Sequence, residues 1–168
     1  MEEELIYNLI NTLEALDVIK YADEDWGQLD YYGAEIPVQY PCALVNIDNV
    51  TWTNQGNAQQ QGTGYITVDV AMVKLTNSSG RAPKFQRAIA GSVHTVKKAV
   101  HQALQNKIHV EGASKMYRKS TVRIRRQDGV QHYRLTYALN ITETVTTGVS
   151  TYQNAIIGIG VTPVSYAL

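Results

Sequence analysis

The stretch Thr121–Ile141 reads TVRIRRQDGVQHYRLTYALNI and gives the clearest indication of the fold. Asp128-Gly129 is a strong signal for a two-residue β-turn, because a type I′ turn needs positive φ at both central residues. Residues 120–127 and 130–142, on either side of it, alternate between apolar and polar. The register set by this turn pairs Ile124 with Tyr133 and Val122 with Leu135. Turn and alternation therefore agree on an antiparallel hairpin with one apolar face.

The other face of this hairpin carries several arginines. The same register pairs Arg125 with His132 and Arg123 with Arg134. Like charges opposite one another on a sheet are destabilising, so we expect something to offset them. Acidic residues from elsewhere in the chain, a neighbouring subunit or DNA phosphate could each do so. Arg123, Arg125 and Arg134 are therefore candidate interface residues.

Periodicity predicts two helices and two more strands. Residues 3–16 and roughly 83–106 carry apolar stripes at helical spacing, with Pro83 at a favoured first helical position. The stripes are Leu5, Ile6, Leu9, Ile10, Leu13 and Leu16, then Phe85, Ile89, Val93, Val96, Val100 and Leu104. Residues 42–52 and 64–75 alternate as strands do. The sequence thus predicts an α+β fold: a mostly antiparallel sheet of about four to five strands packed against two helices.

Two internal segments lack a regular period. Residues 23–41 combine acids, prolines and aromatics, and we expect a long ordered loop there. Its aromatics, Trp26, Tyr31 and Tyr32, either form an interface or pack over the core. Residues 53–63 are polar and punctuated by glycine, which predicts a mobile excursion between two strands that is either disordered or functional. Gln55, Gln59 and Gln60 in this excursion are further candidate interface residues.

The length of 168 residues suits one domain, so we expect a single domain over residues 1–168. Residues 146–168 are rich in threonine, glycine and valine and could form an edge strand or an extended arm. The acidic start at Met1-Glu2-Glu3-Glu4 is unlike a secretory signal, and no stretch is apolar for long enough to span a membrane. We therefore expect no membrane partner.

The formal net charge is zero, but it is unevenly distributed. Residues 1–35 hold ten acids and one base, which gives 1 − 10 = −9, whereas residues 74–134 hold fourteen bases and two acids, which gives 14 − 2 = +12. Such asymmetry indicates nucleic-acid contact, complementary contacts between subunits, or two surfaces that pair within one fold.

Motifs for catalysis or metal binding are absent from the sequence. It contains no HExxH, CxxC, GxSxG, GxxxxGK[ST] or GxGxxG pattern. The histidines lack the ligand spacing of zinc sites, and the one cysteine, Cys42, is read as a small buried apolar residue. We therefore expect no enzyme activity, no cofactor and no metal. A small enzyme that uses Cys42 or a histidine is the alternative.

The order of elements resembles that of the tail-terminator, or tail-completion, proteins of long-tailed bacteriophages. The resemblance covers roughly residues 3–142 and lies in the layout: a helix, Pro37-Val38-Gln39-Tyr40-Pro41, a polar loop, a strand, a long helix and a hairpin. It implies an α+β protein that assembles as a hexameric ring, caps the tail tube and joins it to the head connector. DNA passes through such a ring without specific binding.

The resemblance also implies a set of protein partners. They would be further copies of the chain, the tail tube protein and the head connector or neck proteins, in a virion assembled in the host bacterial cytoplasm. The acidic and basic segments would then make head-to-tail subunit contacts, which close into rings when the rotation permits. The alternatives are a head–tail adaptor or neck protein, and a nucleic-acid-binding module that uses Arg123, Arg125, Arg126 and Arg134.

Overall fold

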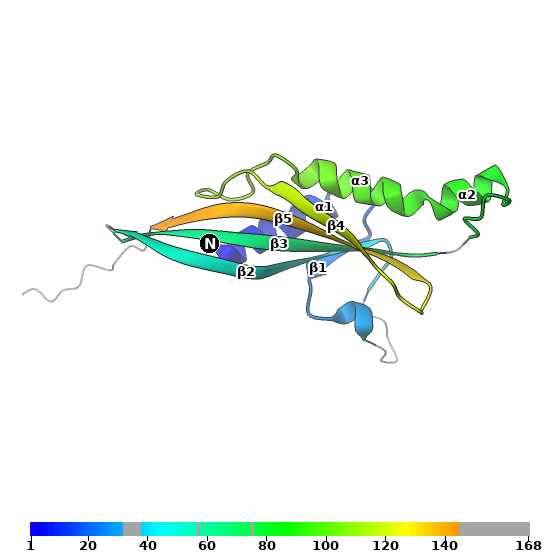
Figure 1. Cartoon of the computed structure of the whole chain (residues 1–168), viewed down its shortest axis with the longest axis horizontal. Coiled ribbons are helices and arrows are strands. Elements are labelled where there is room, and N and C mark those ends of the chain that lie inside the picture. The colour runs from blue at the N-terminus through cyan, green and yellow to red at the C-terminus, as the bar shows by residue number, and fades with distance from the viewer. Residues whose placement is uncertain (32–37, 57, 75, 145–168) are drawn as a thin grey trace, which may run out of the picture.

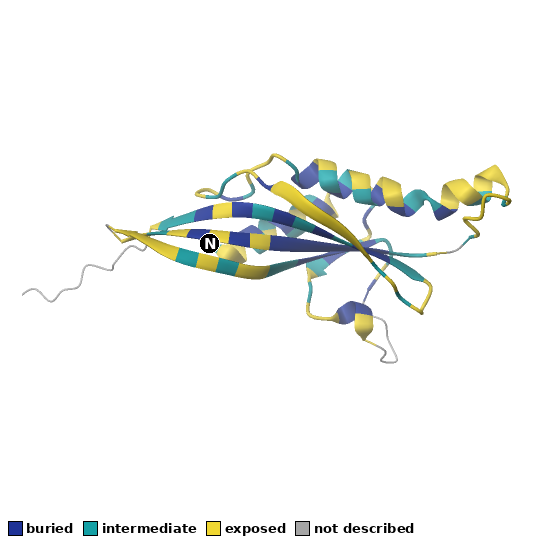
Figure 2. Cartoon of the chain, viewed as in Figure 1, coloured by how far each residue is buried: buried dark blue, intermediate teal, exposed yellow. Residues whose placement is uncertain are grey.

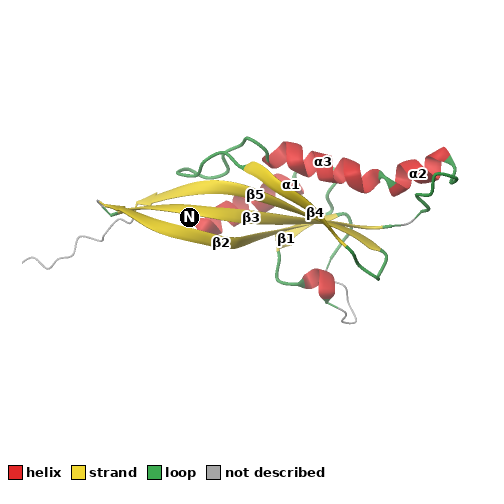
Figure 3. Cartoon of the chain, viewed as in Figure 1, coloured by secondary structure: helices red, strands yellow, loops and turns green. Residues whose placement is uncertain are grey.

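The computed structural model describes residues 1–31, 38–56, 58–74 and 76–144. Five strands form one sheet in the order β1-β2-β3-β5-β4, with α-helices on one face (Figures 1 and 3). The strands are β1 (Tyr21–Glu24), β2 (Cys42–Gly56), β3 (Gln59–Val73), β4 (Tyr117–Ile124) and β5 (Val130–Thr144); the helices are α1 (Glu2–Glu14), α2 (Lys84–Ala90), α3 (Ser92–Leu104) and the 3-10 turn η1 (Gln28–Asp30). β1 is parallel to β2, and every other neighbouring pair is antiparallel. The predicted α+β fold is confirmed.

The main core lies between the sheet and the helices α1 and α3. Leu5, Leu9 and Leu13 of α1 are fully buried, as the helical period predicted. From the sheet they meet alternate residues of β2, β3 and β5, among them Val45, Val68 and Leu135. Burying one such side chain contributes about 1.5–3 kcal/mol. The central strands are accordingly the most buried part of the sheet (Figure 2). No helix in the described part of the chain is long and apolar enough to cross a membrane.

The opposite face of the sheet is only partly covered. A smaller buried cluster lies near its β1 edge, under η1 and the segment after residue 37; it comprises Leu29, Val38, Cys42, Leu44 and Ala71. We call the sheet face that carries this cluster the open face, because none of the described α-helices packs on it. The second half of β1 and the whole of η1 lie in the segment 23–41, which the sequence predicted to be a long ordered loop, and β1 itself was not predicted.

The predicted mobile excursion over residues 53–63 is wrong. β2 continues to Gly56 and β3 begins at Gln59, so most of this segment is paired β-ribbon. The ribbon projects away from the helices, and both of its faces are largely exposed, which removes the apolar alternation that marks a half-buried strand (Figures 1 and 2). A Cβ added at Gly64 would lie 2.8 Å from the carbonyl oxygen of Asn49, so this glycine allows the strands β2 and β3 to approach closely.

The single predicted helix over residues 83–106 is divided. Gly91 separates α2 from α3, and α2 projects past the end of the sheet (Figure 1). Phe85 and Ile89, which the apolar stripe placed in the core, are 65% and 47% exposed. The stripe on α3 behaves as predicted, with Val93, Val96, Val100 and Leu104 buried. A helical stripe predicts which side is apolar, but not whether the sheet extends far enough to cover it.

The β4–β5 pairing exists, but its predicted register is wrong by one residue. Asp128 and Gly129 belong to a five-residue loop, in which the Asp128 carboxylate accepts the backbone N–H of Val130 at 3.1 Å. Val122 consequently pairs with Arg134, and Arg123 with Tyr133. A one-residue slip moves every side chain of a strand to the other face. Because β4 is an edge strand that no helix covers, burial does not enforce its apolar alternation.

Two of the predicted interface features fall outside the described residues. Tyr32 and the arm over residues 146–168 lie there, as does the middle of the segment 23–41.

Candidate functional site

A buried ion pair lies at the centre of the open face. Arg134 on β5 donates two hydrogen bonds to Asp69 on β3, with Nε to Oδ1 at 2.8 Å and Nη2 to Oδ2 at 2.7 Å. His132 Nε2 lies 3.1 Å from the same Oδ2. The Asp69 side chain is 3% exposed, whereas that of Arg134 is 41% exposed. The arginine thus neutralises a carboxylate inside the sheet while its own edge remains accessible.

The protonation of Asp69 follows from these contacts. Burial by itself would raise the pKa of this carboxyl, but the two hydrogen bonds from Arg134, the charge of that arginine and the nearby His132 ring outweigh burial and lower it. The hydrogen bond to Asp69 raises the pKa of the Arg134 guanidinium. Both groups are therefore charged at neutral pH, and an acid elsewhere in the chain offsets Arg134.

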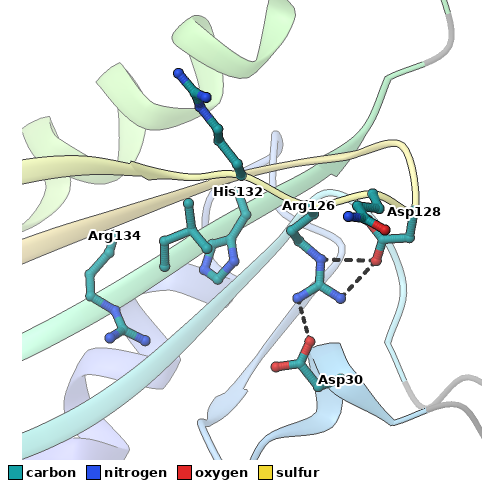
Figure 4. Close-up of a pocket in the computed structure, with 8 residues that line it drawn as sticks. Asp30, Arg126, Asp128, His132 and Arg134 are labelled. Atoms are coloured by element: carbon teal, nitrogen blue, oxygen red, sulfur yellow. Dashed lines mark hydrogen bonds and ion pairs between the residues drawn. The ribbon is translucent and has the colours of Figure 1, made fainter.

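A second arginine joins the β4–β5 loop to η1 (Figure 4). Arg126 Nη1 donates to Asp30 at 2.6 Å, Nη2 donates to the Leu29 carbonyl at 2.6 Å, and both Nε and Nη2 donate to Asp128 Oδ2 at 2.9 and 2.7 Å. The Arg126 side chain is only 8% exposed. Its five-donor fork suits such a multiple contact, which a lysine could not reproduce.

Replacing Arg126 with alanine should loosen this contact. The Leu29 carbonyl and Asp128 would lose their donor, while Asp30, whose side chain is 74% exposed, would be hydrated instead. Because hydrogen bonds to charged groups contribute about 1.5–3 kcal/mol and water recovers part of that, we expect a loss of about 1–2 kcal/mol. Chemical denaturation measures it. Arg126→Lys should not restore the wild-type midpoint; full restoration would show that charge alone matters.

These residues surround a shallow cavity of about 410 Å³. Figure 4 shows His132 between Arg134 and Arg126, with Asp30 and Asp128 close to the latter. The remaining lining residues are Ile124, Arg125 and Gln127. Charges are largely matched here, since Arg126 has two acidic partners and Arg134 has Asp69 beneath it. Across the described residues, no three side chains of His, Cys, Asp or Glu gather as a metal site requires.

Four further bases lie on β4 or directly after it, and one of them, Arg125, also lines the cavity. Arg118, Lys119, Arg123 and Arg125 are exposed, and none has a carboxylate partner within the described ranges. Arg123 lies 5.9 Å from the centre of the Tyr133 ring, and Lys97 of α3 lies 4.4 Å from it. The three predicted arginines are therefore not one cluster: Arg134 is on the open face, Arg123 is on the helix face beside Tyr133, and Arg125 follows the end of β4.

The predicted aromatic and glutamine candidates are exposed but separate from these bases. Trp26 and Tyr31 are 57% and 51% exposed, and their rings meet edge to face with centroids 6.1 Å apart. Gln28, which is fully buried, fixes their loop by accepting the Trp26 backbone N–H at 2.9 Å. Gln55 Nε2 donates to Gln61 Oε1 at 3.1 Å across the β2–β3 ribbon, where Gln59 and Gln60 also lie.

The candidate nucleophile and ligands of the enzyme alternative are engaged in packing. Cys42 is fully buried, and burial raises the pKa of its thiol to about 12, so it is a protonated thiol at neutral pH. His101 Nδ1 lies 3.2 Å from the hydroxyl of Tyr137, and His94 packs against Tyr133. These contacts favour a structural role for each side chain.

The sequence did not predict the buried ion pair of Asp69 or the hydrogen bonds by which Arg126 connects the β4–β5 loop to η1. Asp69 stands in the apolar run Ile66–Met72, where a carboxylate needs a buried partner, and that was the available signal. Arg126 gave no signal, because its partners Asp30 and Leu29 come from a turn 96 residues away along the chain.

Comparison with known proteins gives a fold but no family. No protein family matches the sequence, and no curated protein does. Among solved structures, a chain of "Virion of native gene transfer agent (GTA) particle" superimposes with a TM-score of 0.50 at 10% identity. The match covers 80% of this chain and 92% of that one. At this identity the likeness shows that the two chains share a fold.

Proposed function

We propose that this chain is a structural virion protein that caps a phage tail tube and joins it to the head connector, acting by ring assembly. The observation that carries the proposal is the fold shared with a chain of a gene transfer agent virion across most of both chains. Its partners would be further copies of itself, the tail tube protein and the neck proteins. DNA would pass through the ring without sequence-specific contact.

The surface chemistry supports a role in contact more than in catalysis. The one thiol is buried and protonated, and the arginines of the cavity are largely matched by acids. Exposed groups include the bases of β4, the Trp26–Tyr31 pair and the polar β2–β3 ribbon. Surfaces of this kind bind other chains, and we propose no enzyme activity.

Deleting the gene for this chain from the phage or phage-like genome that encodes it tests this role. Electron microscopy of the lysate should show filled heads and separate tails, with tail tubes of irregular length because nothing stops their growth. Supplying the chain in trans should restore joined particles. Unjoined tails of uniform length would instead identify a head–tail adaptor, and normal joined particles would contradict both assignments.

A nucleic-acid-binding module is the weaker alternative. Of the four arginines proposed for it, Arg126 and Arg134 are held in ion pairs within the chain. Phosphate contacts make affinity fall steeply with salt, so retention on DNA or RNA at low salt that is lost on adding salt would favour this alternative.

A further inference from the structure

The strand β4 forms one edge of the sheet. Among the described residues its only neighbouring strand is β5, and its residues from Tyr117 to Arg123 are all exposed (Figure 2). An edge strand presents backbone N–H and C=O groups that can pair with another chain. At the start of β4 one of them is already used, because the Arg118 N–H donates to Gln105 Oε1 at 2.9 Å. Its eight residues make it long enough for such a contact.

The charge on this edge determines what can bind there. Arg118, Lys119, Arg123 and Arg125 give it four positive charges, and the segment Tyr117–Arg125 contains no acid. Two β4 edges would repel each other, because like charges brought together at an interface cost several kcal/mol. The edge therefore selects an acidic partner over a second β4.

An acidic surface lies at the opposite edge of the same sheet. There, the N-terminus of α1 and the end of β1 border a groove of about 340 Å³. Its walls are the carboxylates of Glu2, Glu3 and Glu24 together with Ile6, Tyr7 and Ile10. Apolar walls with a carboxylate rim suit an arginine or lysine, whose aliphatic stem packs while its charged head pairs.

The topology makes these two edges geometrically compatible. β1 and β2 run in one direction, β3 in the opposite one, β5 back with β2, and β4 again opposite. β4 of one copy placed beside β1 of the next is thus antiparallel to it, the arrangement with the more stable backbone pairing. A contact between two different surfaces of identical chains is head to tail, and it closes into a ring when the rotation permits.

We infer that the β4 edge of one copy binds the α1–β1 edge of a second copy, with its basic side chains in the groove lined by Glu2, Glu3 and Glu24. This inference rests on the proposed ring assembly and names the two surfaces that build it. The sheet then continues from subunit to subunit, and the opposite charges of residues 1–35 and 74–134 fix the direction.

Two charge-reversed variants test the contact. One carries Lys119→Glu and Arg125→Glu on the β4 edge, and the other carries Glu3→Lys and Glu24→Lys on the α1–β1 edge. Alone, each variant places like charges in every contact, so we expect its self-association to weaken at least about tenfold relative to wild type. Sedimentation and native mass spectrometry at low salt measure this.

Mixing the two variants in equal amounts gives the decisive measurement. Each contact in an alternating assembly then joins opposite charges again, so rings with an even number of subunits should re-form. The control for the β4-edge variant carries Lys84→Glu and Lys98→Glu, which change net charge by the same amount and sign at exposed positions of α2 and α3. It should associate as wild type does.

The outcomes separate the interface from the function. If wild type assembles and the reversed variants assemble equally well, or if their mixture fails to recover, this interface is wrong while the ring proposal stands. A wild-type chain that stays monomeric at every concentration and also fails to decorate isolated tails would overturn both.

Discussion

The variant Arg134→Met should lose about 3 kcal/mol of unfolding free energy at neutral pH. Methionine keeps the aliphatic stem but leaves Asp69, 3% exposed, as a buried carboxylate without its two strongest donors. Breaking a buried ion pair by removing one partner costs about 3–5 kcal/mol. The lower end applies here, because the Arg134 side chain is 41% exposed and His132 stays near the carboxylate. Urea denaturation measures the loss.

The pH dependence of this loss identifies its cause. In the wild type, the pKa of Asp69 is below its unfolded value of about 3.9, so the pair stabilises the fold above about pH 4 and stops doing so as the pH falls through the folded pKa. In the variant, burial is no longer outweighed, and Asp69 takes up a proton at higher pH. The difference between wild type and variant should therefore be largest at neutral pH and shrink in acid.

Two further variants test whether the unpaired Asp69 carboxylate causes the loss of stability. Arg87→Met removes the same group from an exposed position on α2 and should change stability by no more than about 0.5 kcal/mol. The double variant Asp69→Leu/Arg134→Met removes both charges and should be more stable than Arg134→Met alone, since an apolar pair can replace a buried ion pair. A double variant that is less stable than the single one would show that Asp69 is not the source of the cost.

The sequence predicts most of the fold because burial imposes a period. Leu5, Leu9 and Leu13 repeat at helical spacing, and Ile66, Val68 and Val70 alternate, because each set faces the same core. Where an element leaves the core, the period stops being informative. Phe85 and Ile89 continue the stripe of α3 but belong to α2, which lies beyond the sheet.

The surface contacts were harder to predict, for two physical reasons. The β4–β5 loop that accompanies the observed register contains side-chain hydrogen bonds of Asp128 and Arg126, and Arg126 also binds Asp30 far away in the chain. A sequence shows residue types and spacing but not such long-range pairing, so Arg134 was grouped with Arg123 although they lie on opposite faces. The charge asymmetry, by contrast, is obtained by adding the charges within each segment of the sequence. It can therefore be recognised without knowing the fold.

The substitution Gly64→Val tests the close strand pairing at the base of the observed β-ribbon. Gly64 pairs with Val50 on β2 and with Leu139 on β5, so it lies inside the sheet. An added Cβ would lie 2.8 Å from the carbonyl oxygen of Asn49 and 2.8 Å from Cγ2 of Val50, closer than real Cβ contacts come. Overpacking costs about 1–3 kcal/mol, and we expect about 2 kcal/mol because the obstructing oxygen belongs to the backbone.

Comparing two neighbouring glycines locates the strain. At Gly62 an added Cβ would meet only side-chain atoms, Cγ1 of Val50 at 2.8 Å and the Trp52 ring at 3.0 Å. Val50→Ala should therefore relieve Gly62→Ala but not Gly64→Ala, because the second clash includes the Asn49 backbone. Gly80→Val, where a Cβ would meet nothing within 4 Å, is the matched control. If thermal unfolding shows Gly64→Val to be as neutral as Gly80→Val, the strands do not pack as closely at Gly64 as the pairing with Val50 requires.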